Sequence, residues 1–133
     1  MEKFRTEIDI RPDKEHRIDH SDGIVMLGSC FTDNVGALLR RDGFNVTFNP
    51  FGPLYNPASI ENVITRALLD ISYSTSSFVQ DEQGLWHCLD FASKYVSNEP
   101  EHLASHINTQ LQELRDKLLN ASTVIITLGT AFV

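Results

Sequence analysis

The chain has 133 residues, of which 41% are hydrophobic, and its 18 acidic and 11 basic side chains leave a formal net charge of −7. These values are typical of one globular domain. Nucleic acids and anionic membrane surfaces bind clustered Lys and Arg, but the basic residues here are scattered, so we expect neither as a partner. No segment has the apolar length of a signal-peptide core or a transmembrane helix, and two cysteines without metal-ligand spacing fit a reducing compartment. The expected location is cytoplasmic.

The first half of the chain predicts alternating strands and helices. Residues 1–21 are polar and are expected to form an arm or an edge strand that covers the sheet. The continuous apolar run at 24–27 is typical of a strand buried on both faces. Residues 35–41 predict an amphipathic helix that stops at Gly43, and residues 44–48 alternate as a second strand.

The second half continues the pattern after an irregular region. Asn56 followed by Pro57 predicts a helix start. Residues 72–97 predict a hairpin or an irregular insertion. Asn98 and Glu101 have the spacing of a capping box at the start of a long helix, and residues 123–128 predict a final buried strand. Strands alternating with helices predict a doubly wound α/β domain with a parallel sheet, and the whole chain, 1–133, is expected to belong to one such domain.

Ser29 is the strongest candidate for chemistry, because it follows the first predicted strand at the start of a helix. The free N–H groups of a helix start can stabilise a developing oxyanion beside a serine nucleophile. Such a serine needs a base, and none of the five histidines has a spacing that identifies it. The alternative is structural: Ser29 and Cys30 are small residues that close a strand-to-helix turn, with Ser29 as the N-cap.

Other readings of this loop fail on spacing. A dinucleotide fingerprint would need glycine at the positions of Cys30 and Asp33, and a P-loop would need a Gly-Lys-Ser/Thr sequence that is absent. A phosphatase-type cysteine loop would need arginine where Gly36 stands. His102 and His106 have i, i+4 spacing but no evident third ligand, so we expect solvated histidines, no metal site and no cofactor.

Four blocks together resemble the GSCFA-domain family: residues 28–31 (Gly-Ser-Cys-Phe), 49–57, 84–87 and 127–131. Residues 4–7 also resemble its start, so the likeness spans the chain. GSCFA domains are related to the SGNH/GDSL hydrolases. The resemblance therefore implies a three-layer α/β/α, flavodoxin-like fold with a serine nucleophile directly after the first strand.

The resemblance implies roles for particular residues. Ser29 would be the nucleophile and would give its own N–H to an oxyanion hole, in which Gly52 supplies a second backbone N–H. Thr130 stands where SGNH enzymes usually have asparagine, and is a weaker hydroxyl donor. Asn56 has two possible roles: it is an alternative oxyanion donor to Gly52, or it is the N-cap of the next helix.

Trp86 and His87 are candidates for substrate contact in the third block. Their alternatives are a core anchor for Trp86 and a half-buried, hydrogen-bonded histidine for His87. Ala92 stands where the family tends to carry histidine, which removes any contact made by that side chain. Cys88 is expected to be a small buried hydrophobic residue.

The resemblance also places the catalytic Asp-x-x-His pair beyond Val133. The chain is therefore expected to be the N-terminal portion of its domain, with a sheet that is incomplete at the C-terminus and an exposed edge prone to self-association. The function expected of the complete domain is hydrolysis of an ester or O-acyl bond in a small molecule or saccharide, with this portion inactive alone. The alternative is a non-catalytic module that binds an anion or saccharide.

Overall fold

The computed structural model describes residues 8–91 and 95–129, and its centre is a parallel three-stranded sheet. The strands are β1 (Ile24–Gly28), β2 (Val46–Phe48) and β6 (Thr123–Thr127), in the order β2-β1-β6. Ile24 lies opposite Val46 on one side and opposite Thr123 on the other. The middle strand is therefore the one that the continuous apolar run at 24–27 predicted.

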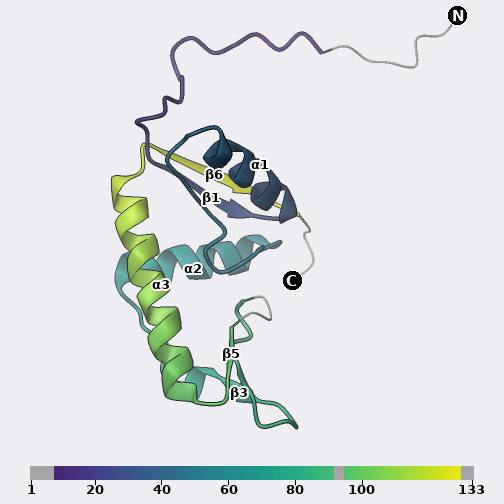
Figure 1. Ribbon diagram of the computed structural model, residues 1–133, viewed down its shortest axis with the longest axis vertical. Coiled ribbons are helices and arrows are strands. Elements are labelled where there is room, and N and C mark those ends of the chain that lie inside the picture. Colours follow the sequence, from purple (N-terminus) through teal and green to yellow (C-terminus); the bar gives the residue numbers. More distant parts are fainter. Residues whose placement is uncertain (1–7, 92–94, 130–133) are drawn as a thin grey trace, which may run out of the picture.

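Helices cover both faces of this sheet (Figure 1). Helix α1 (Cys30–Arg41) packs on the face that carries Ile24 and Met26. Helices α2 (Pro57–Leu69) and α3 (Pro100–Asn120) pack with Val25 and Leu27 on the other face. The result is a mixed α/β fold with α/β/α layers, which confirms the predicted fold class.

Side-chain caps account for two of the three α-helix starts in the described residues. Ser29 caps α1 by accepting a hydrogen bond from the Phe31 N–H, and Asn56 caps α2 by accepting one from the Ser59 N–H. The capping box predicted at Asn98 is wrong: the N-cap of α3 is Glu99, which makes no side-chain capping bond. Pro100 favours that start at the first helical position, because its fixed φ suits a helix and its missing N–H would have had no partner within the helix.

Strand β6 corrects the prediction of a buried final strand. Val124 and Ile126 are 47% and 49% exposed, although the register places them beside the buried Val25 and Leu27. Among the described strands, β6 lies at the edge of the sheet. Helix α2 does not cover it completely, and a groove of about 380 Å³ separates the two elements. Pro57, Ile60, Ile64 and Leu128 also line this groove. The self-association expected at this edge stays a prediction.

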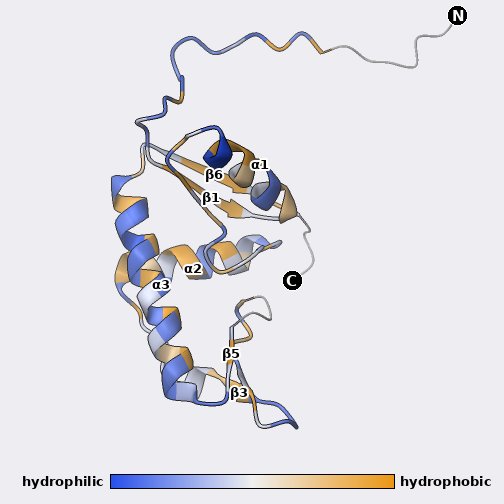
Figure 2. Cartoon of the chain, viewed as in Figure 1, coloured by the Kyte–Doolittle hydropathy of each residue, from blue (hydrophilic) through white to orange (hydrophobic). Residues whose placement is uncertain are grey.

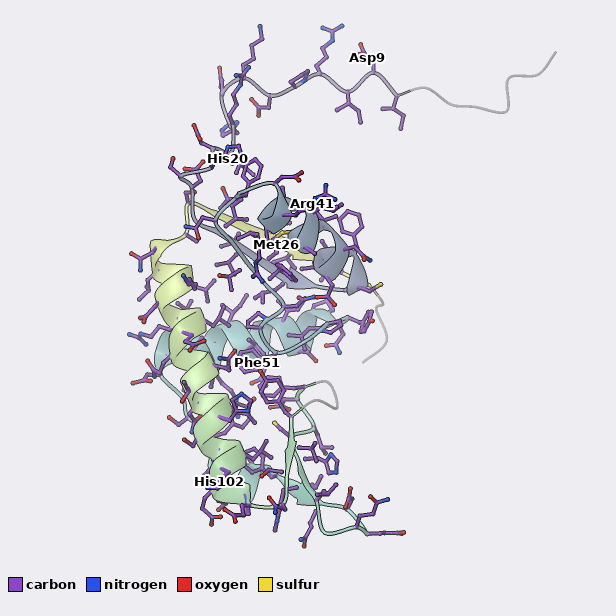
Figure 3. The ribbon with its side chains drawn as sticks, in the orientation of Figure 1. Asp9, His20, Met26, Arg41, Phe51 and His102 are labelled. Atoms are coloured by element: carbon purple, nitrogen blue, oxygen red, sulfur yellow. The ribbon has the colours of Figure 1, made fainter. Side chains whose placement is uncertain are left out.

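A second, antiparallel sheet lies across α2 from the first (Figure 1). It contains β3 (Val79–Gln80), β4 (Trp86–His87) and β5 (Val96–Ser97), and a 3-10 turn, η1 (Thr75–Ser77), precedes it. The hairpin predicted in residues 72–97 is therefore confirmed. Phe51, which is fully buried and labelled in Figure 3, stacks on Phe91 at 4.4 Å and joins this sheet to the main core.

Residues 1–21 were expected to form an arm or an edge strand that covers the sheet. The described part, residues 8–21, is an arm: it contains no strand and does not cover the sheet. Ile8 and Ile10 are 77% and 81% exposed, and Figure 2 shows the arm as mostly hydrophilic. Its apolar residues are too scattered among charges to bury a face. The arm meets the domain at His20, whose ring stacks on Phe44 at 4.0 Å (Figure 3). None of the helices within residues 8–91 and 95–129 has the length and apolar composition of a membrane span.

Candidate functional site

Ser29 lies at the switch point of the parallel sheet. The chain leaves β1 through α1 to reach β2 on one side, and reaches β6 on the other side through α2 and α3. In open α/β sheets, ligands bind outside the carboxyl ends of the two strands where the winding reverses. Here those ends are Gly28 of β1, which Ser29 directly follows, and Thr127 of β6, which pairs with Gly28.

A cluster of hydroxyls surrounds Ser29, which is 8% exposed. The Oγ atom of Ser29 lies 3.3 Å from Thr127 Oγ1 and accepts a hydrogen bond of 3.3 Å from the Phe31 N–H. Thr127 Oγ1 also lies 2.6 Å from the hydroxyl of the fully buried Thr32. Among the described residues, the Ser29 hydroxyl is thus held by a hydroxyl and a backbone N–H, with no histidine beside it.

The two backbone donors expected for an oxyanion hole both have partners in this structure. The Ser29 N–H donates to the carbonyl oxygen and to Oγ1 of Thr127, each at 3.2 Å. The Gly52 N–H donates to the carbonyl oxygen of Asn49 at 2.9 Å. An oxyanion held by either N–H would have to share or displace these acceptors.

Two glycines allow close approach around Ser29. Gly28 has φ of +151°, and a Cβ there would lie 2.1 Å from the Thr127 carbonyl oxygen. A Cβ on Gly129 would lie 2.7 Å from the Tyr55 ring and 3.4 Å from Ser29 Cβ. Tyr55 is exposed, and its carbonyl accepts the Gly129 N–H at 3.0 Å. The backbone after β6 and the Tyr55 ring therefore form one wall beside Ser29.

Asn49 is a component of this site that the sequence reasoning missed. It is 6% exposed and has a positive φ of 38°, and its side-chain amide bonds to the backbone of Gly28 and Ser29 and to the Asp33 carboxylate. The signal that could have found it is its position, directly after a predicted strand and directly before Pro50. Asparagine is one of the few non-glycine residues that readily adopt positive φ.

The other predicted site residues are spread over the fold. Asn56 lies at the start of α2, where its Oδ1 accepts the Ser59 N–H at 2.8 Å. Trp86 and His87 form β4 in the second sheet, away from the carboxyl end of β1, so the structure does not bring them together with Ser29. The Nε2 atom of His87 lies 2.7 Å from Oδ2 of Asp81, and this hydrogen bond lowers the pKa of Asp81. Thr130 and Ala92 lie outside the described residues.

A second polar cluster lies between α2 and the segment after β4. The Tyr73 hydroxyl donates to Asp90 Oδ2 at 2.5 Å, and the Asn62 side chain donates to the same oxygen at 2.9 Å. Burial, and then the Asp90 carboxylate, raise the pKa of Tyr73. The Arg66 guanidinium lies 4.1 Å above the Tyr73 ring. Burial raises the pKa of the neighbouring Cys88 thiol to about 11, so this thiol stays protonated, as expected of a buried hydrophobic residue.

An Asp-x-x-His spacing does occur in the chain, in the N-terminal arm. The Nδ1 atom of His16 lies 2.7 Å from Oδ2 of Asp13, and this bond lowers the pKa of Asp13. The arm joins the amino end of β1, whereas Ser29 follows the carboxyl end of the same strand. These two ends are roughly 16 Å apart, because β1 has five residues. The pair is therefore remote from Ser29. His102 is solvated beside Glu99, and no metal-binding group occurs in the described ranges.

One comparison with known proteins identifies a relationship. The family model described as "GSCFA family" matches residues 23–133, which include Ser29 and every helix and strand of the described residues. Residues 1–22, with the arm, lie outside this match. No curated protein and no solved structure matches the chain significantly.

Proposed function

Because this chain belongs to the GSCFA family, we propose that it carries the nucleophile of a serine hydrolase related to the SGNH enzymes. Ser29 Oγ would attack the carbonyl carbon of an ester or O-acyl group, release the alcohol and form an acyl-serine that water then hydrolyses. The observation that supports this most directly is the position of Ser29, at the start of α1 and at the switch point between β1 and β6.

The start of α1 favours the negative charge that such a reaction develops. Helix N-termini carry a positive partial charge, and α1 begins beside the Ser29 side chain, whose Oγ accepts the Phe31 N–H. Ser29, Gly52 and Thr130 remain the proposed oxyanion donors. For Ser29 and Gly52, the bonds to Thr127 and Asn49 would have to open or be shared when substrate binds. The substrate proposed is a small-molecule or saccharide ester.

The second candidate function is a non-catalytic module that binds an anion or a saccharide. It is favoured by the hydrogen bonds of Ser29: its N–H bonds to Thr127, and among the described residues no base contacts its hydroxyl. In this case the same strand ends and helix start would bind a ligand without attacking it.

A fluorophosphonate probe separates the two functions. We expect it to modify Ser29. Added imidazole should accelerate the reaction by accepting the Ser29 proton, because no base contacts the Ser29 hydroxyl among the described residues. Peptide mass spectrometry would locate the adduct. Ser29→Ala should abolish the adduct. Ser105→Ala, which removes an exposed serine on α3, is the matched control and should label like the unaltered chain. A folded chain whose Ser29 stays unmodified with imidazole present would favour the binding module.

A further inference from the structure

We propose that Asn49 is a positioning residue that holds the backbone on both sides of the Ser29 side chain. The inference rests on the proposed role of Ser29 and adds a residue that acts through it. Asn49 follows β2, and its own N–H donates to the Met26 carbonyl at 2.9 Å, so its backbone is tied to the middle strand.

The Asn49 side chain takes the place of its own backbone in the β1–β2 ladder. In a continued parallel ladder, the Gly28 N–H would donate to the backbone carbonyl of Asn49. That carbonyl instead turns to accept the Gly52 N–H, because the chain at Asn49 adopts a φ of +38°. Oδ1 of Asn49 accepts the Gly28 N–H at 2.9 Å in its stead. The Asn49 side chain therefore extends the hydrogen bonding between β1 and β2 as far as Gly28, the residue before Ser29, although β2 itself ends at Phe48.

The other end of the amide holds the far side of Ser29. Nδ2 of Asn49 donates to the Ser29 carbonyl at 3.3 Å and to Asp33 Oδ1 at 2.7 Å. The single amide thus uses its acceptor and both donor hydrogens on groups before, at and after Ser29. Since this amide is buried, any of these groups left unpaired costs free energy, which favours one conformation of the turn.

The backbone and side-chain contributions of Asn49 can be separated by substitution. Asn49→Gly tolerates the positive φ but removes the amide. Asn49→Asp keeps the shape and an acceptor for the Gly28 N–H, but loses both donors and places a second carboxylate against Asp33. Asp70→Gly is the matched control: Asp70 is the other non-glycine residue with positive φ among the described residues, and it lies at the end of α2.

The primary measurement is amide hydrogen exchange of Gly28 by NMR, which needs no activity. In Asn49→Gly we expect the Gly28 N–H to exchange at least about 10-fold faster than in Asp70→Gly, after correction for global stability, because a buried bond is lost. The fluorophosphonate reaction of Ser29 in the presence of imidazole should slow by about 10-fold or more in Asn49→Gly and Asn49→Asp. The double variant Asn49→Asp/Asp33→Asn restores a donor between positions 33 and 49, and should recover part of that rate.

The outcomes separate this proposal from the hydrolase proposal. Unchanged Gly28 exchange in Asn49→Gly would overturn the positioning role, whatever the labelling shows. Faster exchange with an unchanged labelling rate would also overturn it, because the turn would then be held without effect on Ser29. Faster exchange in a chain whose Ser29 never reacts would support Asn49 as the group that holds the turn and would remove the hydrolase function.

Discussion

Two polar clusters of this protein contain similar groups in different surroundings. The Ser29 cluster (Ser29, Thr32, Asp33, Asn49 and Thr127) joins the carboxyl ends of β1 and β6 to the start of α1. The Tyr73 cluster (Asn62, Arg66, Tyr73 and Asp90) joins α2 to the segment before η1 and the segment after β4. The polar side chains of both clusters are hydrogen-bonded, so hydrogen bonding alone does not mark a functional site.

Their positions distinguish the two clusters. In the Tyr73 cluster, aromatic rings pack around the buried tyrosine: the rings of Phe78 and Phe91 lie 6.3 and 5.5 Å from the Tyr73 ring. The Ser29 cluster instead borders the exposed side chains of Phe31 and Tyr55 and lies at the switch point of the sheet. We therefore infer that the Tyr73 cluster stabilises the fold, whereas the Ser29 cluster lies where its side chains can contact a ligand.

The largest expected effect tests the structural role of the Tyr73 cluster. Asp90→Ala removes the acceptor shared by Tyr73 and Asn62, and should lower the free energy of unfolding by about 2–3 kcal/mol in urea titrations. Asp90→Asn, which keeps an acceptor, is the matched control and should cost less. Labelling of Ser29 should not change at urea concentrations where both variants are folded. A large labelling defect in Asp90→Asn would show that the two clusters are coupled.

A smaller loss is expected in the Ser29 cluster. Thr127→Val removes the hydroxyl that lies 2.6 Å from the buried Thr32, and should cost about 1–2 kcal/mol of unfolding free energy because the Thr32 hydroxyl is left unpaired. The double variant Thr32→Val/Thr127→Val removes both hydroxyls and should be less destabilised than the sum of the single variants. Additive losses would show that the two hydroxyls do not stabilise each other.

Alkaline pH should affect the Tyr73 cluster and spare the Ser29 cluster. The pKa of Tyr73 is raised above its ordinary value of 10.0, so its contribution to stability is complete below that pH and is lost as pH rises toward the folded-state pKa. Cys88, with its pKa raised from 9.0 to about 11, acts in the same direction. Urea titrations on both sides of pH 10 should show stability falling with pH, and falling less steeply in Tyr73→Phe. An equal slope in Tyr73→Phe would contradict this assignment.

The smallest expected effect concerns His87. Because the His87–Asp81 pair is partly exposed and lies on the second sheet, His87→Ala should leave both the urea midpoint and the Ser29 labelling rate unchanged within error. His16→Ala, in the arm, should likewise change neither the urea midpoint nor the Ser29 labelling rate. Slower labelling in His87→Ala would show that β4 contributes to the Ser29 site, as expected from the sequence. Slower labelling in His16→Ala would identify the arm as the source of the base.

Local sequence patterns predicted much of the fold and one member of the site. The apolar run at 24–27 became the buried middle strand, Asn56 capped α2, and Ser29 was located at the start of α1. These features depend on residues a few positions apart, whose spacing is visible in the chain. The start of α3 was misplaced because the capping box at Asn98 competed with Pro100, and the proline determined the helix start.

What the sequence determined by itself is therefore the α/β class, the family and the candidate nucleophile. Only the tertiary structure decided which neighbours that nucleophile has: Ser29 and Thr127 are 98 residues apart in the chain, and Asn49 reaches Gly28 across 21. It also decided that the apolar strand β6 is half exposed, because an edge position depends on which strands pair and not on the strand's own residues. Hydrogen bonds between distant segments leave no periodic pattern along the chain, so the contacts that hold Ser29 could be seen only in the fold.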